Sequence, residues 1–401
     1  MDTLPHLASS YLETLCEKIS NRRVGSAGNR QATAFFREVM EENRLAVESQ
    51  PFDCIDFRAG EIHLRASNQE FEAYISPYSL GCDITVELAA ASTIEEMETL
   101  DAHGKLLLLH GGIAREQIMP RNFVFYNPEE HQRVYRALDA AGPAAVITAV
   151  GRNSGLTAAL YPYPMFEDGD LDIPSCYTSD KEGQRLLSHI GEEASLFMDA
   201  ARIPQQAENI IARTGGDPQR KIVVTAHIDA KTGTPGALDN GGGTVVLMLL
   251  ANLLKDYSEN HMVEIASLNG EDYWSAGGQM EYIRRNADVW DQMRLLINID
   301  GAGYRGFPTG ISFYECPEDL TAAAKKVRSD SPAITDMEPW FMGDHMIFVQ
   351  NGVPAAALTT TNFVDVWKRI AHTEKDTSDI VDPALLVEAA RFIHAWILTL
   401  D

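Results

Sequence analysis

The pattern of hydrophobic and polar positions changes twice along this chain of 401 residues. Residues 4–19 and 30–45 space their apolar side chains every three or four positions, which predicts two helices. From about residue 56 to residue 202 the pattern consists of short alternating runs such as EIHLRA, ITVELA and AAVITAV, which are typical of β-strands. Within this β-rich stretch, helical spacing is confined to residues 129–141 and 180–190.

Predicted strands and helices alternate from residue 207 to the end. The strands are 208–213, 222–226, 262–268, 293–299 and 311–315, the helices are 241–255, 275–286, 318–328 and 383–400, and residues 343–358 form a helix and then a strand. Residues 241–255 are apolar almost all round, which predicts a helix buried against a sheet. Asp382 is well placed to cap the last helix. The alternation predicts an α/β fold with a mixed, mostly parallel sheet covered by helices on both faces.

The chain is long for a single domain, and its patterns suggest two. The two N-terminal helices share the helical texture of the C-terminal part and have no β-rich character. We therefore predict a discontinuous domain of residues 1–55 and 205–401, with residues 56–204 as an inserted β-rich domain.

The charge balance excludes some classes of partner. There are 33 Lys and Arg against 58 Asp and Glu, which gives a formal net charge of −25. Such a charge opposes binding to nucleic acid or to an anionic membrane.

No run approaches the roughly 18–20 apolar residues of a membrane span, and the first residues lack the pattern of a signal peptide. Five scattered cysteines without a C-x-x-C indicate reduced thiols, so we expect a cytoplasmic protein.

Three predicted strands each end at a polar cluster. His227 and Asp229 follow the first strand, Glu271 and Asp272 follow the second, and Asp300 follows the third. Folds of this class place their sites at the carboxyl ends of such strands. Neutral imidazole and carboxylate groups are good ligands for zinc and similar divalent ions.

Two more candidates lie outside the strands. Asp239 stands in LDNGGG before the apolar helix, where the glycines let the backbone approach an ion or a neighbouring strand, and where an aspartate alone is commonly a helix cap. His372 stands in AHTEKDT, where Asp376 could orient it or fix the loop. Each cluster has an ordinary structural explanation by itself. Jointly, two histidines and three or four carboxylates suit a two-metal site, in which one carboxylate can bridge ions about 3.5–4 Å apart.

The spacing of these residues also suggests chemistry. Asp229 lies on the same face as His227 in an extended chain and can hold its second ring nitrogen. The adjacent carboxylates of Glu271 and Asp272 would repel each other unless a cation or a shared proton relieves them. One can bind metal while the other acts as a general base on a water. A metal pair also polarises a carbonyl, so the set meets the requirement for amide hydrolysis.

The ordered motifs HID, LDN, GED, NID and HTEKDT resemble the co-catalytic di-zinc aminopeptidases of peptidase family M28. That family includes bacterial leucyl aminopeptidases, glutamate carboxypeptidase and relatives of glutaminyl cyclase. The resemblance covers residues 207–401 and, less fully, the N-terminal helices with their RRVGSAGN turn. It implies that His227 and Asp300 hold one zinc ion, that Asp272 and His372 hold the other, and that Asp239 bridges the two.

The same resemblance assigns two further roles and a second domain. Glu271 would be the general base that takes the proton from the bridging water, and Asp229 would be the partner of His227. The segments GKLLLLHGG, ALDAAGPAAVITAVG and DIPSCYTS of the insertion resemble a protease-associated domain.

Two motifs depart from the family pattern. Where relatives often have Glu-Glu-x-Gly, this chain has EDYW at residues 271–274, and Trp274 could crowd or shape the substrate pocket. Where relatives often have Ser-Asp-His, residues 343–345 are GDH. Relatives commonly stabilise the oxyanion with a tyrosine near this segment, and the adjacent residues include none. Our hypothesis is that His345 is the electrophilic donor, the alternative being a helix-capping or core histidine.

These expectations describe a metal-dependent exopeptidase that hydrolyses the N-terminal peptide bond of short peptides. Its cofactors would be two divalent ions, Zn²⁺ or else Co²⁺ or Mn²⁺, which the ligand types do not separate. A carboxypeptidase, a dipeptidase or another amidohydrolase is the alternative, with Arg305, Lys368 and Arg369 as possible carboxylate-binding groups. A non-catalytic binding protein on the same fold is the alternative from another class, but it should have lost ligands. A homo-oligomer is compatible with the sequence.

Overall fold

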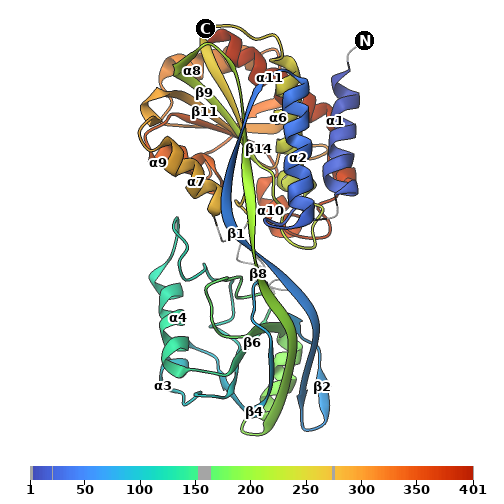
Figure 1. The fold of residues 1–401 in the computed structure, drawn as a ribbon, viewed down its shortest axis with the longest axis vertical. Coiled ribbons are helices and arrows are strands. Elements are labelled where there is room, and N and C mark those ends of the chain that lie inside the picture. Colours follow the sequence, from blue (N-terminus) through green and yellow to red (C-terminus); the bar gives the residue numbers. More distant parts are fainter. Residues whose placement is uncertain (1–2, 20, 152–163, 273–275, 401) are drawn as a thin grey trace. The chain divides into compact units, whose positions relative to one another are not determined.

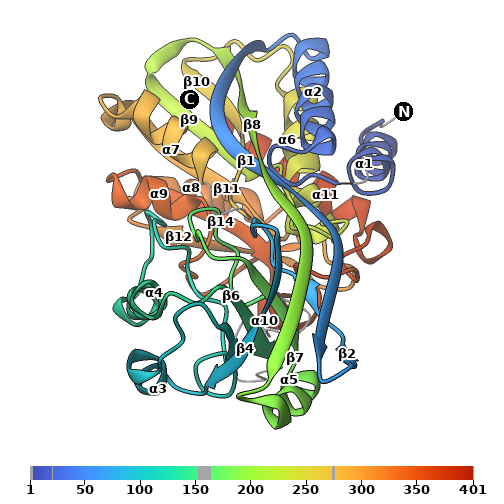
Figure 2. The same ribbon diagram turned by 60° about the horizontal axis from the view of Figure 1, so that its bottom comes forward.

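The computed structural model describes residues 3–19, 21–151, 164–272 and 276–400, and it divides into two compact units. The first unit consists of Met1–Cys54 and Gln206–Asp401, and the second is Ile55–Gln205. The chain passes from one unit to the other within strands β1 (Ala46–Ala66) and β8 (Glu193–Gly215). Figures 1 and 2 show the ribbon from two directions.

The first unit is built on a mixed sheet with parallel strands at its centre. The strand order is β13 (Ile334–Asp336), β12 (Thr309–Tyr314), β14 (Ala355–Thr360), β11 (Met293–Ile299), β9 (Asp217–His227), β10 (His261–Leu268) and β8. The four strands from β14 to β10 run parallel, whereas β12 runs antiparallel to β14 and β8 runs antiparallel to β10. Strand β13 pairs parallel with β12. The parallel strands are apolar on both faces because both faces are covered by helices. The predicted α/β fold is therefore confirmed.

Helices cover the two faces of this sheet in separate groups. The helices are α1 (Leu4–Glu13, continued by a π-helical turn at Thr14–Lys18), α2 (Ala27–Glu42), α6 (Gly242–Leu253), α8 (Glu318–Arg328), α11 (Pro383–Thr399), α7 (Gly277–Asn286), α9 (His345–Gln350) and α10 (Phe363–Arg369). Figure 1 shows α1, α2 and α6 on one side of the sheet and α7 and α9 on the other. Helix α6 packs against the strands and is covered by α1, α2 and α11, so its nearly continuous apolar surface is buried as predicted.

Side-chain caps explain where two of these helices begin. Asp382 Oδ1 accepts a hydrogen bond from Ala384 N at 3.0 Å, which confirms its predicted place at the start of α11. Helix α2 begins three residues before its predicted start because Ser26 Oγ accepts from Asn29 N at 3.0 Å. The short elements β13 and α10 were not predicted, since three and seven residues are too few to show a clear period.

The second unit also has parallel strands at its centre. Its elements are the later part of β1, β2 (Gln69–Phe71), β3 (Tyr74–Ile75), β4 (Cys82–Ala91), α3 (Ile94–Thr99), β5 (Leu106–Leu109), α4 (Glu129–Ala141), β6 (Ala145–Val150), β7 (Ser175–Ser179), α5 (Asp180–Leu186) with a 3₁₀ turn at Leu187–His189, and the first part of β8. Strands β4, β5, β6 and β7 run parallel, and β8 pairs antiparallel with β4. Helices α4 and α5 lie where predicted, whereas α3 is too short to have shown helical spacing.

Two further expectations concern the whole chain. All five cysteines have free thiols. Among the helices that the structure describes, none has both the length and the apolar character needed to cross a bilayer.

Candidate metal centre

The parallel strands of the first unit bring their polar ends to one edge of the sheet. Strand β9 lies between β10 and β11, with His227 opposite Leu268 on β10 and Thr225 opposite Asn298 on β11. The residues that follow each strand therefore emerge side by side. Two loops reach the same place, one carrying Asp239 ahead of α6 and the other carrying His372 ahead of α11.

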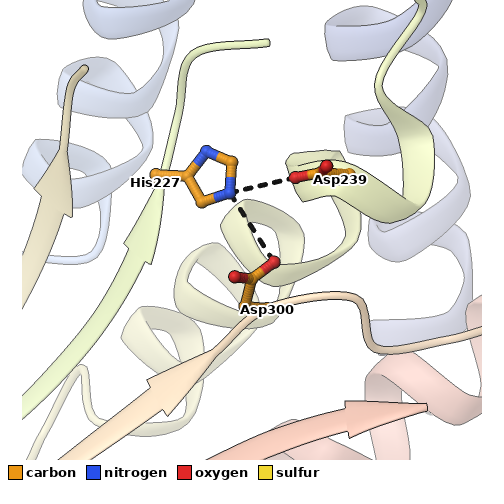
Figure 3. A group of neighbouring side chains, drawn as sticks. All are labelled: His227, Asp239 and Asp300. Atoms are coloured by element: carbon orange, nitrogen blue, oxygen red, sulfur yellow. Dashed lines mark ion pairs between the residues drawn. The ribbon is translucent and has the colours of Figure 1, made fainter. Parts of the chain in front are cut away.

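The five predicted metal ligands meet at this edge. His227 Nε2 lies 3.1 Å from Asp239 Oδ1 and 3.6 Å from Asp300 Oδ1, and Figure 3 shows the two carboxylates facing the same ring nitrogen. His372 Nε2 lies 3.1 Å from Asp239 Oδ2 and 2.9 Å from Asp272 Oδ1. The two oxygens of Asp239 thus face different histidines, and Asp239 belongs to two of the three candidate ligand groups; the third consists of His227, Asp229 and Asp272.

These distances fit a pair of divalent ions. Zinc binds nitrogen and oxygen ligands at about 2.0–2.2 Å, so two ligands of one tetrahedral ion are about 3.3–3.6 Å apart. One of the four separations is 3.6 Å, and the other three, at 2.9, 3.1 and 3.1 Å, are a few tenths of an ångström shorter. Within the described part of the chain, Nε2 of the buried His227 makes no hydrogen bond and is faced by the carboxylates of Asp239 and Asp300, and Asp272 Oδ2 makes no hydrogen bond either. Buried polar atoms without hydrogen-bond partners are costly, and metal coordination would satisfy these two.

The charges of the ligands already complement one another in the protein without metal. Burial by itself would lower the pKa of His227, but Asp229, Asp239 and Asp300 raise it well above the ordinary value. Burial likewise opposes protonation of His372, yet Asp272 and Asp239 raise its pKa to about 10. Metal binding requires the neutral imidazole, so the metal affinity of these two histidines should fall as pH falls.

Asp229 does more than the sequence indicated. Its Oδ1 accepts hydrogen bonds from Gly270 N at 2.8 Å and Glu271 N at 3.3 Å, and its Oδ2 accepts from Asp272 N at 3.0 Å. Asp229 Oδ1 lies 3.7 Å from His227 Nδ1, which is an electrostatic contact rather than a hydrogen bond. Asp229 therefore holds the turn that presents Glu271 and Asp272, in addition to facing the histidine.

Glu271 lies at the start of this turn and is only partly exposed. Burial raises the pKa of its carboxyl group well above the ordinary value, His227 opposes the shift, and Asp300 and Asp344 add to it. Two divalent ions nearby would act in the opposite direction and favour the carboxylate. Trp274, expected to shape the pocket, lies outside the described residues, so that expectation stays a prediction.

The glycines of LDNGGG bring α6 close to the end of β11. A Cβ atom on Gly243 would lie 2.6 Å from Ile299 O, which leaves no space for a side chain. Asn240 Nδ2 donates to the same carbonyl at 2.8 Å, and Asn240 Oδ1 accepts from Gly243 N at 3.0 Å. The helix-capping role therefore belongs to Asn240, and Asp239 is left to face the histidines. The peptide bond between these two residues is cis.

The GDH segment at residues 343–345 borders the ligand cluster. A Cβ atom on Gly343 would come within 3.2 Å of Asp300 Oδ2. Asp344 is buried, and its Oδ1 accepts from Gln279 Nε2 at 2.7 Å. Burial raises the pKa of Asp344 to about 7, although His227 opposes the shift. In the GDH motif the sequence singled out His345 as a candidate and not Asp344.

His345 is buried, and its surroundings weigh against the hypothesis of an electrophilic donor. His345 Nε2 lies 3.0 Å from Trp340 O. A carbonyl can only accept, so this nitrogen holds the proton and Nδ1 is an acceptor. Burial lowers the pKa of His345, which keeps the ring neutral. Tyr314 also contacts this segment, but its hydroxyl donates to Trp340 O and accepts from Trp340 N.

Known proteins resemble this chain in sequence and in fold. Residues 209–397 match the family model of peptidase family M28. The chain is 24% identical over 422 residues to aminopeptidase YwaD of Bacillus subtilis (strain 168), covering 97% of this chain and 83% of that protein. It is 23% identical over 397 residues to carboxypeptidase Q of Xenopus laevis, covering 93% and 81%.

A solved structure extends the comparison to the fold. The crystal structure of BSAP, a zinc aminopeptidase from Bacillus subtilis, superposes with a TM-score of 0.78 at 20% identity, covering 99% of this chain and 95% of that one. Residues 209–397 are therefore similar to peptidase family M28, and the chain shares the fold of a zinc aminopeptidase. The family match begins at residue 209, so the resemblance of the insertion to a protease-associated domain stays a prediction.

Proposed function

We propose that this protein is a di-metal aminopeptidase that removes the N-terminal residue of short peptides. The observation that carries the proposal is the sign of the charge around the metal centre. Six carboxylates surround the two histidines, namely Asp229, Asp239, Glu271, Asp272, Asp300 and Asp344. Two divalent ions would supply four positive charges, so with all six ionised the balance is 4 − 6 = −2.

A negative balance favours an ammonium group near the scissile bond and disfavours a carboxylate. The free N-terminus of a peptide is positively charged and would be attracted to this site, whereas its C-terminus is negatively charged and would be repelled. If Asp344 holds a proton, as its raised pKa allows, the balance is −1 and the preference has the same direction.

The cations considered for carboxylate binding have other surroundings. Arg305 Nη2 donates to Val381 O at 2.8 Å and Arg305 Nε donates to Asp379 O at 3.2 Å, so its guanidinium holds the loop before α11. Lys368 and Arg369 are exposed at the end of α10. None of the three has a described contact with the ligand cluster.

The residues of the chain would divide the reaction among them. His227 and Asp300 would hold one ion, Asp272 and His372 the other, and Asp239 both. When bound, the two ions would lower the pKa of a water and polarise the scissile carbonyl. Glu271 would take the proton of the attacking water and pass it to the leaving amine.

Asp229 would keep Glu271 in place through the three backbone N–H groups of its turn. His345, whose Nδ1 can accept but not donate, has no donor role in this scheme. The oxyanion would then rely on the ions themselves or on a group outside the described contacts.

A carboxypeptidase or dipeptidase on the same centre is the second candidate, because a relative of this chain is named carboxypeptidase Q. The deciding experiment measures metal content by mass spectrometry and hydrolysis of matched free and N-acetylated dipeptides and aminoacyl anilides. We expect two ions per chain and cleavage of free-amine substrates alone. Cleavage indifferent to acetylation would replace the aminopeptidase with a carboxypeptidase or another amidohydrolase. No metal and no cleavage after added Zn²⁺ would favour a binding protein.

A further inference from the structure

The loop that presents Asp239 is held from one side by a buried arginine. Arg22 is 3% exposed and belongs to the RRVGSAGN turn. Its Nη1 donates to Pro235 O at 2.8 Å, its Nη2 donates to Gly236 O at 2.7 Å, and its Nε donates to Ile228 O at 3.0 Å. The guanidinium therefore binds the carbonyl groups at the beginning of this loop.

A buried carboxylate holds the same loop from the other side. Asp376 is fully buried, and its Oδ1 accepts from Leu238 N at 2.7 Å while its Oδ2 accepts from Asp239 N at 3.0 Å. The backbone carbonyl of Asp376 also accepts from Ala237 N at 3.1 Å. Three successive backbone N–H groups of the loop thus donate hydrogen bonds to Asp376, and each oxygen of its carboxylate accepts one of them.

This arrangement ties together two ligands that are far apart in the chain. Asp376 lies four residues after His372 in one loop, and its side chain accepts a hydrogen bond from the backbone N–H of Asp239 in the other. His372 has a φ of +60°, which is uncommon for a residue with a Cβ atom and has to be maintained by its surroundings. The 3.1 Å approach of His372 Nε2 to Asp239 Oδ2 depends on how these two loops are fixed to each other.

We propose that Asp376 is a positioning residue for the metal pair, which sets metal affinity by fixing Asp239 relative to His372, with Arg22 holding the loop from the opposite side. The proposal rests on the proposed function only in that divalent ions occupy the centre. Because Asp239 faces both histidines, a shift of its loop should weaken both ions together. Arg22 lies outside the family match at residues 209–397, so the N-terminal helices would be needed for the centre as well as for the core.

The test compares zinc affinity of the full-length chain with that of Asp376→Asn. Asparagine keeps one acceptor oxygen but turns an NH₂ group toward one of the two backbone N–H donors. After removal of metal, Zn²⁺ is titrated in competition with a chromophoric chelator. We expect both ions to bind about 10–100-fold more weakly, the usual effect of losing a partner behind the ligands. Activity at saturating Zn²⁺ should recover with KM unchanged.

Two further variants separate positioning from folding. Asp382→Asn is the matched control, because Asp382 also accepts from a backbone N–H but caps α11 away from the ligands; its zinc affinity should equal that of the unmodified chain. Asp376→Glu keeps the charge and both acceptors but displaces them by one methylene, and it should also bind zinc more weakly. Thermal unfolding of the metal-free proteins reports the structural contribution separately.

The outcomes distinguish this proposal from the proposed function. Unchanged zinc affinity in folded Asp376→Asn and Asp376→Glu would overturn it. Failure of both variants to fold, with Asp382→Asn folded, would assign Asp376 to the fold and overturn it as well. Two bound ions without peptide hydrolysis in the unmodified chain would refute the aminopeptidase but leave the comparison of affinities intact.

Discussion

Strands β4, β5 and β6 of the second unit run parallel, as β10, β9 and β11 do in the first. The second-unit strands are followed by Ser92, His110 and Gly151. Ser92 N and Ser92 Oγ each donate to Glu96 Oε2 at 2.7 Å. The polar residue after β4 therefore binds a side chain in the first turn of helix α3. All groups of side chains that could share an ion, among the described residues, lie in the first unit.

Buried carboxylates show the same contrast between the units. Asp168 of the second unit accepts from Arg121 N at 2.9 Å and Asp170 N at 2.7 Å, so each of its oxygens is met by a backbone N–H group. Asp239 of the first unit instead faces two histidines. A polar strand end therefore becomes a reactive site only where charged groups from separate segments face one another without enough backbone donors between them.

The largest effect should follow from changing the shared ligand. Asp239→Asn replaces a carboxylate that faces both histidines with an amide that offers one oxygen. We expect fewer than two ions per chain by mass spectrometry and loss of hydrolysis, because Asp239 is shared by the group with His227 and Asp300 and the group with Asp272 and His372. Asp168→Asn is the control and should keep whatever metal the unmodified chain holds. Two tightly bound ions in Asp239→Asn would mean that Asp239 does not bridge.

The next effect separates chemistry from metal binding. Glu271→Gln keeps the size of the side chain and its place in the turn but removes the base. We expect kcat to fall about 10²–10⁴-fold, the usual contribution of a general base, with metal content unchanged. Steady-state kinetics on an aminoacyl anilide, with metal analysis of the same sample, provides the check. Turnover near the original rate would exclude Glu271 as the base.

A matched pair of substitutions compares the two units directly. Asp229→Asn and Asp168→Asn each weaken a buried carboxylate that accepts backbone hydrogen bonds, so each should lose about 1–3 kcal/mol of unfolding free energy. Only Asp229→Asn should also weaken metal binding, by about 10–100-fold, because its turn presents Glu271 and Asp272. Denaturant unfolding and zinc titration measure the two effects. Equal zinc affinity in both variants would remove the distinction drawn between these loops.

The smallest effect concerns pH and the second unit. His131 Nδ1 accepts from Met119 N at 3.0 Å, and burial lowers the pKa of His131, although Glu116 opposes the shift. A lowered folded-state pKa means that stability is present above the unfolded value of about 6.5 and is lost as pH falls below it.

His131→Gln should therefore show a shallower loss of stability across that window, measured by thermal unfolding at a series of pH values. His103→Gln, at an exposed position, serves as the control. The same slope in His131→Gln and the unmodified chain would show that His131 does not contribute to acid sensitivity.

The sequence by itself determined the class of fold and the set of candidate ligands that the structure brings together. Periodicity is a local property, so β11 at 293–299, α8 at 318–328 and α4 at 129–141 were predicted with their observed bounds. Parallel strands present their carboxyl ends at one edge, so polar residues after three strands indicated a common site.

Tertiary structure alone decided how those residues are used. Which oxygen of Asp239 faces which histidine, which ring nitrogen of His345 holds the proton, and which backbone groups Asp376 binds all depend on contacts between distant segments. The side chain of Asp376, expected to act on His372 or on its own loop, accepts from the backbone of Leu238 and Asp239 instead. A hydrogen bond is sensitive to a few tenths of an ångström and to angle, whereas sequence spacing specifies only which face and which end of an element a residue occupies.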